Sequence, residues 1–257
     1  MNRIDELFKN KDGNILSIYF TAGFPKLDDT MEIMEAIEEA GADIIEIGIP
    51  YSDPVADGPT IQDSNNVALN NGMTLKLLFT QLKGLRSKLN IPVVLMGYLN
   101  PIVQFGMEDF CKKCQEVGVD GVIIPDLPMQ QYTDAYKDLF DHYNLRNTFL
   151  ISPQTSEQRI REIDSKTDGF IYMVSSASIT GAKKEVSPEQ IAYFERVRDM
   201  GLKNPRLIGF GISDKASFST ASTYSHGAII GSAFINVVRE AKSFNEEIKT
   251  YIKGVIS

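Results

Sequence analysis

The chain has 257 residues, of which 43% are hydrophobic and 23% are charged, so it holds enough apolar material for a large core. Its formal net charge of -8 argues against binding to nucleic acids or anionic membranes, because no global positive field exists. No apolar run reaches the roughly 18 residues of a transmembrane helix, and the first residues are polar, so we expect a cytoplasmic protein without a signal peptide.

Short apolar runs rich in β-branched residues recur along the chain and predict eight strands. Their nearly continuous apolar character is typical of parallel strands buried on both faces. The predicted strands are Ile15–Phe20, Asp43–Ile49, Pro92–Gly97, Gly121–Pro125, Thr148–Ser152, Gly169–Val174, Arg206–Phe210 and Ala228–Gly231. Amphipathic segments between them predict helices, among them Met31–Ala40, Leu75–Leu89, Met107–Val117, Pro188–Met200 and the segment from Phe234 to the C-terminus.

This alternation predicts an α/β protein in which residues 1–257 form a single (β/α)8 TIM barrel, one catalytic domain. An extra N-terminal helix at Asn2–Phe8 would close the bottom of the barrel. Ser187–Gln190 has the cap, the first-turn proline and the third-position glutamine of a helix start. A doubly wound open sheet is the alternative, because the order of elements alone does not reveal a reversal of strand order.

Cys111 and Cys114 have the C-x-x-C spacing of redox and zinc sites. We interpret them as structural residues, because they lie inside a predicted helix and the chain has no second cysteine pair. The two histidines, His142 and His226, are distant in the sequence.

The first candidate for catalysis is Glu46, a carboxylate within an otherwise apolar predicted strand. A charge in a buried strand is costly unless it has a partner or a function. Alternation places Ile44, Glu46 and Gly48 on one strand face, which we expect to point into the barrel. Burial there would raise the pKa of the carboxyl group and suit it to acid–base chemistry near neutral pH. A purely structural carboxylate bonded to a neighbouring strand is the alternative.

The second candidate is Asp57, in the loop that follows this strand. Asp before Gly is often only a turn former. Three prolines, Pro50, Pro54 and Pro59, stiffen the loop and favour a functional position for Asp57. Active sites of such barrels lie at the C-terminal ends of the strands, where this loop begins.

Glycine-rich strand exits in the last third of the chain predict a phosphate site. They are Ile179–Gly181, Gly209–Ser213 and Gly231–Ala233. Exposed backbone N–H groups and helix N-termini favour phosphate, and the exits of the last two strands are the usual barrel phosphate site. Ser213 and Ser232 could instead be helix caps.

Two absences narrow the chemistry expected at the strand ends. None of these ends carries a lysine that could form a Schiff base, and no histidine is placed to share a metal with a carboxylate there. Two carboxylates and a phosphate site suit proton transfer on a phosphorylated carbon skeleton, either isomerisation or carbon–carbon cleavage.

Residues 42–62, with the sequence ADIIEIGIPYSDPVADGPTIQ, resemble the signature of the tryptophan synthase alpha subunit family. The resemblance extends over nearly the whole chain, with matching pieces at Phe20–Pro25, Val117–Gly121, Pro125–Pro128, Ile179–Gly181, Gly209–Ser213 and Gly231–Ala233. It implies a (β/α)8 barrel that cleaves indole-3-glycerol phosphate to indole and glyceraldehyde 3-phosphate in tryptophan biosynthesis. This is a retro-aldol reaction without metal or Schiff base.

The resemblance also implies roles for individual residues. Glu46 matches the general acid–base carboxylate that protonates the indole ring at C3 and helps to transfer the proton of the glycerol hydroxyl group. Asp57 matches the carboxylate that accepts the indole N–H and stabilises the positive charge of the ring. Tyr172 matches a tyrosine that contacts the substrate beside Glu46.

Further matches concern the substrate pocket. They comprise the indole-pocket positions Phe20, Ile61, Tyr98 and Phe210, the phosphate positions Gly181, Gly211, Gly231 and Ser232, and the mobile-loop threonine Thr180. Family members commonly have glycine two residues before this threonine, and this chain has Ser178. If that glycine needs a positive φ, Ser178 would strain or shift the loop.

The family works as an alpha-beta-beta-alpha complex, in which a beta subunit with pyridoxal phosphate receives indole through a tunnel. Pro50, Asp53 and Asn100 match positions near that interface, although each could simply form a turn. The alpha chain itself is expected to need no cofactor. Two alternatives stay open: another phosphosugar isomerase or lyase on the same barrel, and an inactive barrel that activates a beta subunit.

Overall fold

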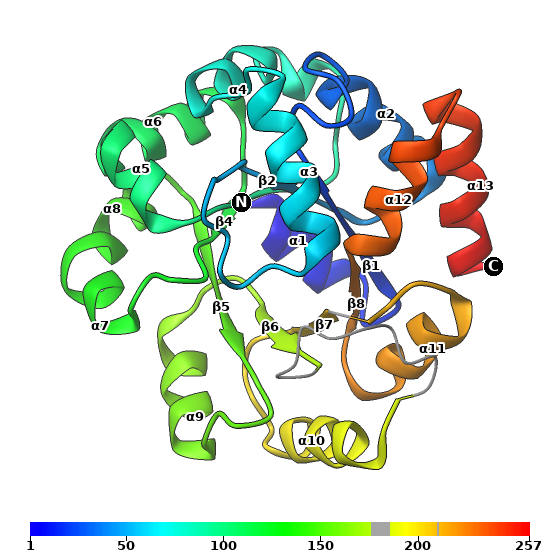
Figure 1. Cartoon of the computed structure of the whole chain (residues 1–257). Coiled ribbons are helices and arrows are strands. Elements are labelled where there is room, and N and C mark those ends of the chain that lie inside the picture. Colours follow the sequence, from blue (N-terminus) through cyan, green and yellow to red (C-terminus); the bar gives the residue numbers. More distant parts are fainter. Residues whose placement is uncertain (176–185, 210) are drawn as a thin grey trace.

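The computed structural model describes residues 1–175, 186–209 and 211–257, and within them eight parallel strands form a closed barrel (Figure 1). Each strand pairs with the next along the chain, and β8 pairs with β1. This closure excludes the open-sheet alternative. The strands are β1 (Ile15–Thr21), β2 (Ile44–Gly48), β3 (Val93–Met96), β4 (Gly121–Ile123), β5 (Arg146–Ile151), β6 (Ile171–Val174), β7 (Arg206–Gly209) and β8 (Gly227–Ile230).

All eight predicted strands are present, and their ends differ from the predicted ones by at most two residues. The strands of the described chain are almost entirely buried, and every residue of β1 and β2 is buried. The barrel interior covers one face of each strand and the helices cover the other, which explains the continuous apolar runs.

Helices surround the barrel as an outer ring (Figure 1). Within the described residues, no helix has the length and apolar character needed to cross a membrane. The helical segments are α1 (Arg3–Asn10), α2 (Thr30–Ala40), α3 (Pro59–Asn70), α4 (Leu75–Gln81), η1 (Leu85–Ser87), α5 (Leu99–Phe105), α6 (Met107–Val117), α7 (Met129–Gln131), η2 (Tyr132–Tyr136), α8 (Lys137–His142), α9 (Glu157–Lys166), α10 (Pro188–Asp199), α11 (Lys215–Tyr224), α12 (Ser232–Glu240) and α13 (Phe244–Ile256).

Two predicted helices are divided. The helix expected over Leu75–Leu89 ends after Gln81, because Gly84 takes a left-handed backbone conformation with φ 80° before the short η1. The segment after Phe234 forms two helices, α12 and α13, with extended backbone at Ala241 between them. The predicted start of α10 is confirmed, since Ser187 and Gln190 form a reciprocal capping box.

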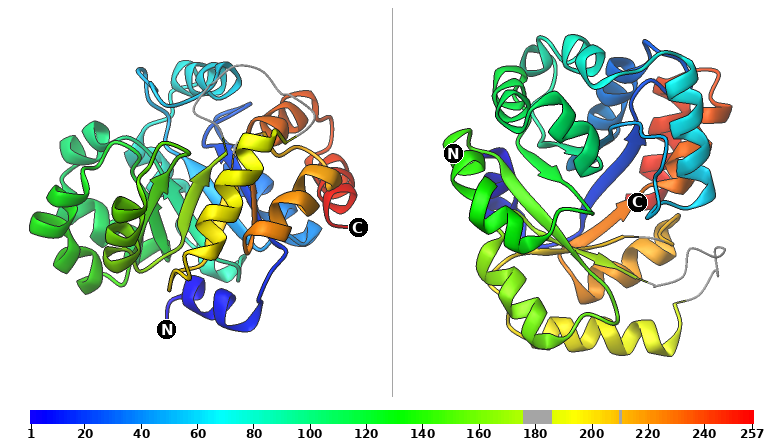
Figure 2. Two further views of the ribbon diagram at one scale, coloured as in Figure 1. Left: turned by 90° about the horizontal axis from the view of Figure 1, so that it is seen from below. Right: turned by 60° about the vertical axis from the view of Figure 1, so that its left-hand side comes forward.

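The extra N-terminal helix is also confirmed, and α1 closes the end of the barrel opposite the segment that leads into α3 (Figure 2). The side chain of Asn2 caps α1 by accepting the N–H of Ile4 at 2.9 Å. The same side chain donates to the carbonyl oxygen of Asp120, just before β4, at 2.8 Å. Ile4 is only 1% exposed beneath the barrel. The opposite end therefore carries the strand C-termini and the candidate site.

Candidate active site

Two carboxylates from one segment of chain lie at the C-terminal side of the barrel. Glu46 is in the middle of β2 and is 0% exposed, whereas Asp57 is in the loop between β2 and α3 and is 6% exposed. Burial of two carboxyl groups so close in the sequence is costly without a compensating interaction or function. Among the described residues, each accepts one side-chain hydrogen bond.

The donor to Glu46 is Ser17 of β1, whose Oγ lies 2.6 Å from Glu46 Oε1. The second oxygen, Oε2, is buried and has no hydrogen-bond partner within the described part of the chain. Burial raises the pKa of Glu46 to about 7, and the bond from Ser17 opposes part of that rise. A carboxyl group with this pKa can both release and accept a proton near neutral pH.

The donor to Asp57 is Tyr98, which follows β3. Tyr98 Oη donates to Asp57 Oδ2 at 3.2 Å and accepts the N–H of Ala56 at 3.0 Å. A turn from Pro54 fixes the loop further, because the Asp57 N–H donates to the Pro54 carbonyl oxygen at 3.0 Å. Burial raises the pKa of Asp57 to about 6, and Tyr98 opposes the rise. Asp57 is therefore mostly ionised at neutral pH and can stabilise a positive charge.

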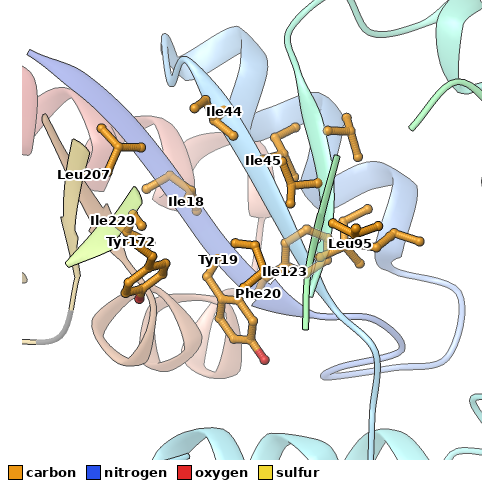
Figure 3. Close-up of a cluster of buried hydrophobic side chains, with 14 of the residues drawn as sticks. Ile18, Tyr19, Phe20, Ile44, Ile45, Leu95, Ile123, Tyr172, Leu207 and Ile229 are labelled. Carbon is orange, nitrogen blue, oxygen red and sulfur yellow. The ribbon is translucent and has the colours of Figure 1, made fainter. Parts of the chain in front are cut away.

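Two tyrosines, Tyr19 of β1 and Tyr172 of β6, complete the buried polar centre. Figure 3 shows both projecting from their strands with the hydroxyl groups turned the same way. Burial raises the pKa of both phenols, and the negative charges of Glu46 and Asp57 raise them further. Both hydroxyl groups therefore stay protonated and can donate hydrogen bonds beside the carboxylates.

Two glycines make room for these tyrosines. A Cβ atom at Gly48 would collide with the hydroxyl group of Tyr19, and one at Gly209 would collide with that of Tyr172. Gly48 is in β2 next to β1, and Gly209 is in β7 next to β6. Each tyrosine therefore extends across a glycine of the adjacent strand.

The glycine-rich exits of β7 and β8 approach the same centre. A Cβ atom at Gly231 would lie 3.4 Å from the Tyr19 ring and 3.8 Å from Ile61 Cδ1, so Gly231 borders both side chains. Gly231 directly precedes α12, whose first residue is Ser232. Gly211 has a φ of 79°, a left-handed conformation that favours glycine. The free N–H groups at the start of α12 provide donors for an anion.

The structure separates Phe20 from this centre, contrary to the sequence prediction. Ser17 bonds to Glu46 inside the barrel, and strand alternation gives Tyr19 the same orientation and Phe20 the opposite one. Phe20 is fully buried on the helix side. The sequence prediction missed Tyr19 and Ser17. A signal for them was present: the polar residues of β1, Ser17 and Thr21, share a strand face with Tyr19.

The residues expected near a partner are gathered around the loop after β2. Pro50 is buried, whereas Asp53 and Asn100 are exposed. Asn100 Nδ2 donates to Tyr51 Oη at 3.4 Å, and the Tyr51 ring packs against Tyr98 with centroids 5.2 Å apart. Other predicted positions lie outside the described residues, namely Ser178, Thr180, Gly181 and Phe210.

The two cysteines are free and lie in the buried face of one helix. Both Cys111 and Cys114 are 0% exposed in α6. Burial raises the pKa of the Cys111 thiol to about 12, which keeps it protonated and poorly nucleophilic.

Comparisons with known proteins agree with this architecture. The family model described as "Tryptophan synthase alpha chain" matches residues 6–254. A tryptophan synthase alpha chain of Christiangramia forsetii is 55% identical over 255 residues, covering 99% of this chain and 98% of the relative. One from Flavobacterium psychrophilum is 57% identical over 240 residues, covering 93% and 94%. A crystal structure of tryptophan synthase subunit alpha from Legionella pneumophila has a TM-score of 0.89 at 32% identity, covering 100% of this chain and 97% of that one.

Proposed function

The chain belongs to the tryptophan synthase alpha chain family, and we propose that Glu46 and Asp57 perform its reaction, the cleavage of indole-3-glycerol phosphate to indole and glyceraldehyde 3-phosphate. The observation that carries this proposal is the pair of buried carboxyl groups, with pKa values raised to about 7 and about 6. Different pKa values in one site suit one group to proton transfer and the other to charge stabilisation.

In the proposed mechanism, protonated Glu46 first gives its proton to C3 of the indole ring. The ring becomes a cationic indolenine, and the Asp57 carboxylate accepts the ring N–H and stabilises the positive charge. The Glu46 carboxylate then takes the proton from the hydroxyl group on the carbon attached to C3. The carbonyl of the aldehyde forms, the carbon–carbon bond breaks and its electron pair returns to the ring, so Glu46 is again protonated.

The remaining candidates bind the substrate. Ile61, Tyr98 and Tyr172 would border the indole ring, and the position of Gly231 next to Tyr19 and Ile61 supports a ligand that reaches from the ring site to the exit of β8. The N–H groups at Gly211, Gly231 and Ser232 would bind the phosphate, helped by the N-terminus of α12. Gly181 and Thr180 of the loop after β6 stay predictions, as does a pocket role for Phe210.

We further propose that the chain works with a beta subunit in an alpha-beta-beta-alpha complex, with Pro50, Asp53 and Asn100 near the interface. The exposure of Asp53, Asn100 and the apolar Val55, which is 79% exposed, supports this surface. Pyridoxal phosphate would belong to the partner. Glu46 would carry both proton transfers of this mechanism, so we expect the chain itself to need no cofactor. The cytoplasmic location and the assignment of residues 1–257 to one catalytic domain stay predictions.

An indole-release assay tests the proposal, with purified chain alone and with a cognate beta subunit. We expect indole and glyceraldehyde 3-phosphate in equal amounts from the chain alone and faster release with the partner. If the chain alone releases no indole but still activates the beta subunit, it would be a catalytically inactive barrel that serves only as an activator. Turnover of phosphosugars without an indole ring would instead indicate another isomerase or lyase.

A further inference from the structure

Ser17 is a polar residue at the centre of an apolar strand, and it is 0% exposed. Its backbone pairs with Ile44 of β2 and with Ile229 of β8, while Glu46 pairs with Tyr19, two positions further along β1. The Glu46 side chain therefore leans back along the strand to reach the Ser17 hydroxyl group at 2.6 Å.

Ser17 is the only side-chain donor to Glu46 in the described part of the chain. The neighbouring titratable groups are the phenols of Tyr19 and Tyr172, whose pKa values respond to the Glu46 charge, and the nearby carboxyl group of Asp57. On β3, the residue paired with Glu46 is the apolar Val94. Among the described residues, no lysine, arginine or histidine forms an ion pair with Glu46.

We propose that Ser17 is the positioning residue for proton transfer, holding the Glu46 carboxyl group through Oε1 and leaving Oε2 to exchange the proton with the substrate. The buried Oε2 has no protein partner in the described residues, as this division of the two oxygens requires. The inference rests on the proposed catalytic role of Glu46 and deepens it, since it assigns the two oxygens different tasks.

The bond also selects a protonation state. A hydroxyl group donates more strongly to an ionised carboxylate than to a neutral carboxyl group, so Ser17 favours the charged form. Burial acts in the opposite direction. Ser17 therefore keeps the proton affinity of Glu46 low enough for release to the indole ring near neutral pH. Without it, Glu46 would hold its proton more tightly and its carboxyl group would be free to rotate.

The test is a pH titration of Glu46 in the full-length chain without substrate. Infrared spectroscopy monitors the titration through the band of the protonated carboxyl group. The Glu46→Gln variant identifies the band by its loss. We expect Ser17→Ala to move the midpoint upward by about one pH unit, the size expected for one hydrogen bond to a charged group. Ser17→Thr keeps the hydroxyl group and should restore the midpoint. If its extra methyl group prevents folding, Ser17→Cys, a weaker donor, should give an intermediate midpoint.

Ser64→Ala is the matched control, because Ser64 is also 0% exposed but its hydroxyl group contacts Thr21 and the Ile61 carbonyl oxygen. It should leave the Glu46 midpoint unchanged. An unchanged midpoint in folded Ser17→Ala, or an equal shift in Ser64→Ala, would overturn the inference. Since no substrate is present, this result does not depend on whether the chain releases indole. Failure of the Ser17 inference can therefore be distinguished from failure of the proposed function.

In turnover, a positioning role predicts that Ser17→Ala lowers kcat about tenfold or more at neutral pH, with little change in KM, because Ser17 does not contact the substrate. Because the reaction begins with protonated Glu46, the fall of kcat at high pH should move upward together with the Glu46 midpoint. A rise in KM without a change in kcat would contradict the role.

Discussion

Tyr98 Oη donates a hydrogen bond to Asp57 Oδ2 at 3.2 Å, and this bond joins the exit of β3 to the loop after β2. The same hydroxyl oxygen accepts the N–H of Ala56 at 3.0 Å, so one side chain fixes both the carboxylate and its backbone. The two partners are 41 positions apart in the sequence, and the segment between them contains α3, α4, η1 and β3. The orientation of Asp57 therefore depends on the packing of the barrel as well as on its own turn.

Replacing Tyr98 by Phe should impair the stabilisation of positive charge by Asp57. The variant leaves Asp57 buried without its donor, so the pKa of Asp57 should rise above its present value of about 6. We expect kcat/KM to fall roughly 10- to 100-fold near neutral pH, the effect of losing a hydrogen bond to a charged group. The pH profile of kcat/KM should move to higher pH.

Tyr51→Phe is the matched control, since the Tyr51 hydroxyl group bonds to Asn100 and not to Asp57. Equal effects of the two substitutions would show that the aromatic stack, rather than the bond to Asp57, is what matters.

Replacing Asp57 by Asn should lower kcat without unfolding the chain. The amide has nearly the same shape but no charge to stabilise the cationic ring. Electrostatic groups of this kind typically contribute about 10²- to 10³-fold in kcat. Steady-state kinetics of indole release measure the loss, and circular dichroism checks the fold. A kcat within a factor of two or so of the unmodified chain would refute the assigned role.

The burial of Glu46 should make stability depend on pH. Its pKa is raised from 4.5 to about 7, so the folded chain binds this proton more tightly than the unfolded chain. The contribution of Glu46 to stability is therefore greatest below pH 4.5 and is lost as the pH rises toward 7. A shift of this size corresponds to roughly 3 kcal/mol in the free energy of unfolding.

Glu46→Gln removes this titration and keeps an acceptor for Ser17. The variant should therefore gain stability relative to the unmodified chain between about pH 5 and 8, measured by urea unfolding at each pH. Glu157→Gln on the exposed surface of α9 controls for the loss of one negative charge. A stability difference that stays constant across this range would contradict the raised pKa of Glu46.

Gly209→Ala should displace Tyr172, because the added methyl group would collide with the tyrosine hydroxyl group. We expect a loss of roughly 1–3 kcal/mol in stability from overpacking, together with a higher KM for the substrate. Gly13→Ala is the control, since no atom lies within 4 Å of the added Cβ there. A Gly209→Ala variant with unchanged stability and KM would argue against the role of Gly209 in seating Tyr172.

The sequence was a good guide to features that depend on local pattern. The strands followed from apolar runs because both of their faces are buried, and Glu46 stood out as the one charge in β2. The inward direction of Ile44, Glu46 and Gly48 followed from strand alternation. The end of α4 was missed because a glycine inside an amphipathic pattern does not by itself reveal a left-handed turn, as at Gly84.

Features that depend on contacts between distant elements were harder to predict from the sequence. Phe20 and Tyr19 are both aromatic, and the bond between Ser17 and Glu46 and the closeness of Tyr19 to Gly48 show that Tyr19 faces the interior. The bond from Tyr98 to Asp57 depends on how the β3 exit packs against the loop, which no local pattern encodes. The same holds for Gly48 and Gly209, because each leaves room for a tyrosine of the adjacent strand.

The central claim is that the buried Glu46 carboxyl group transfers the protons of the cleavage reaction. Its most direct test is kcat for indole release from indole-3-glycerol phosphate by the Glu46→Gln variant, folded and assayed beside the unmodified chain. We predict a loss of at least about 10²- to 10⁴-fold, the usual contribution of general acid–base catalysis. Near-normal indole release by the folded variant would contradict the claim.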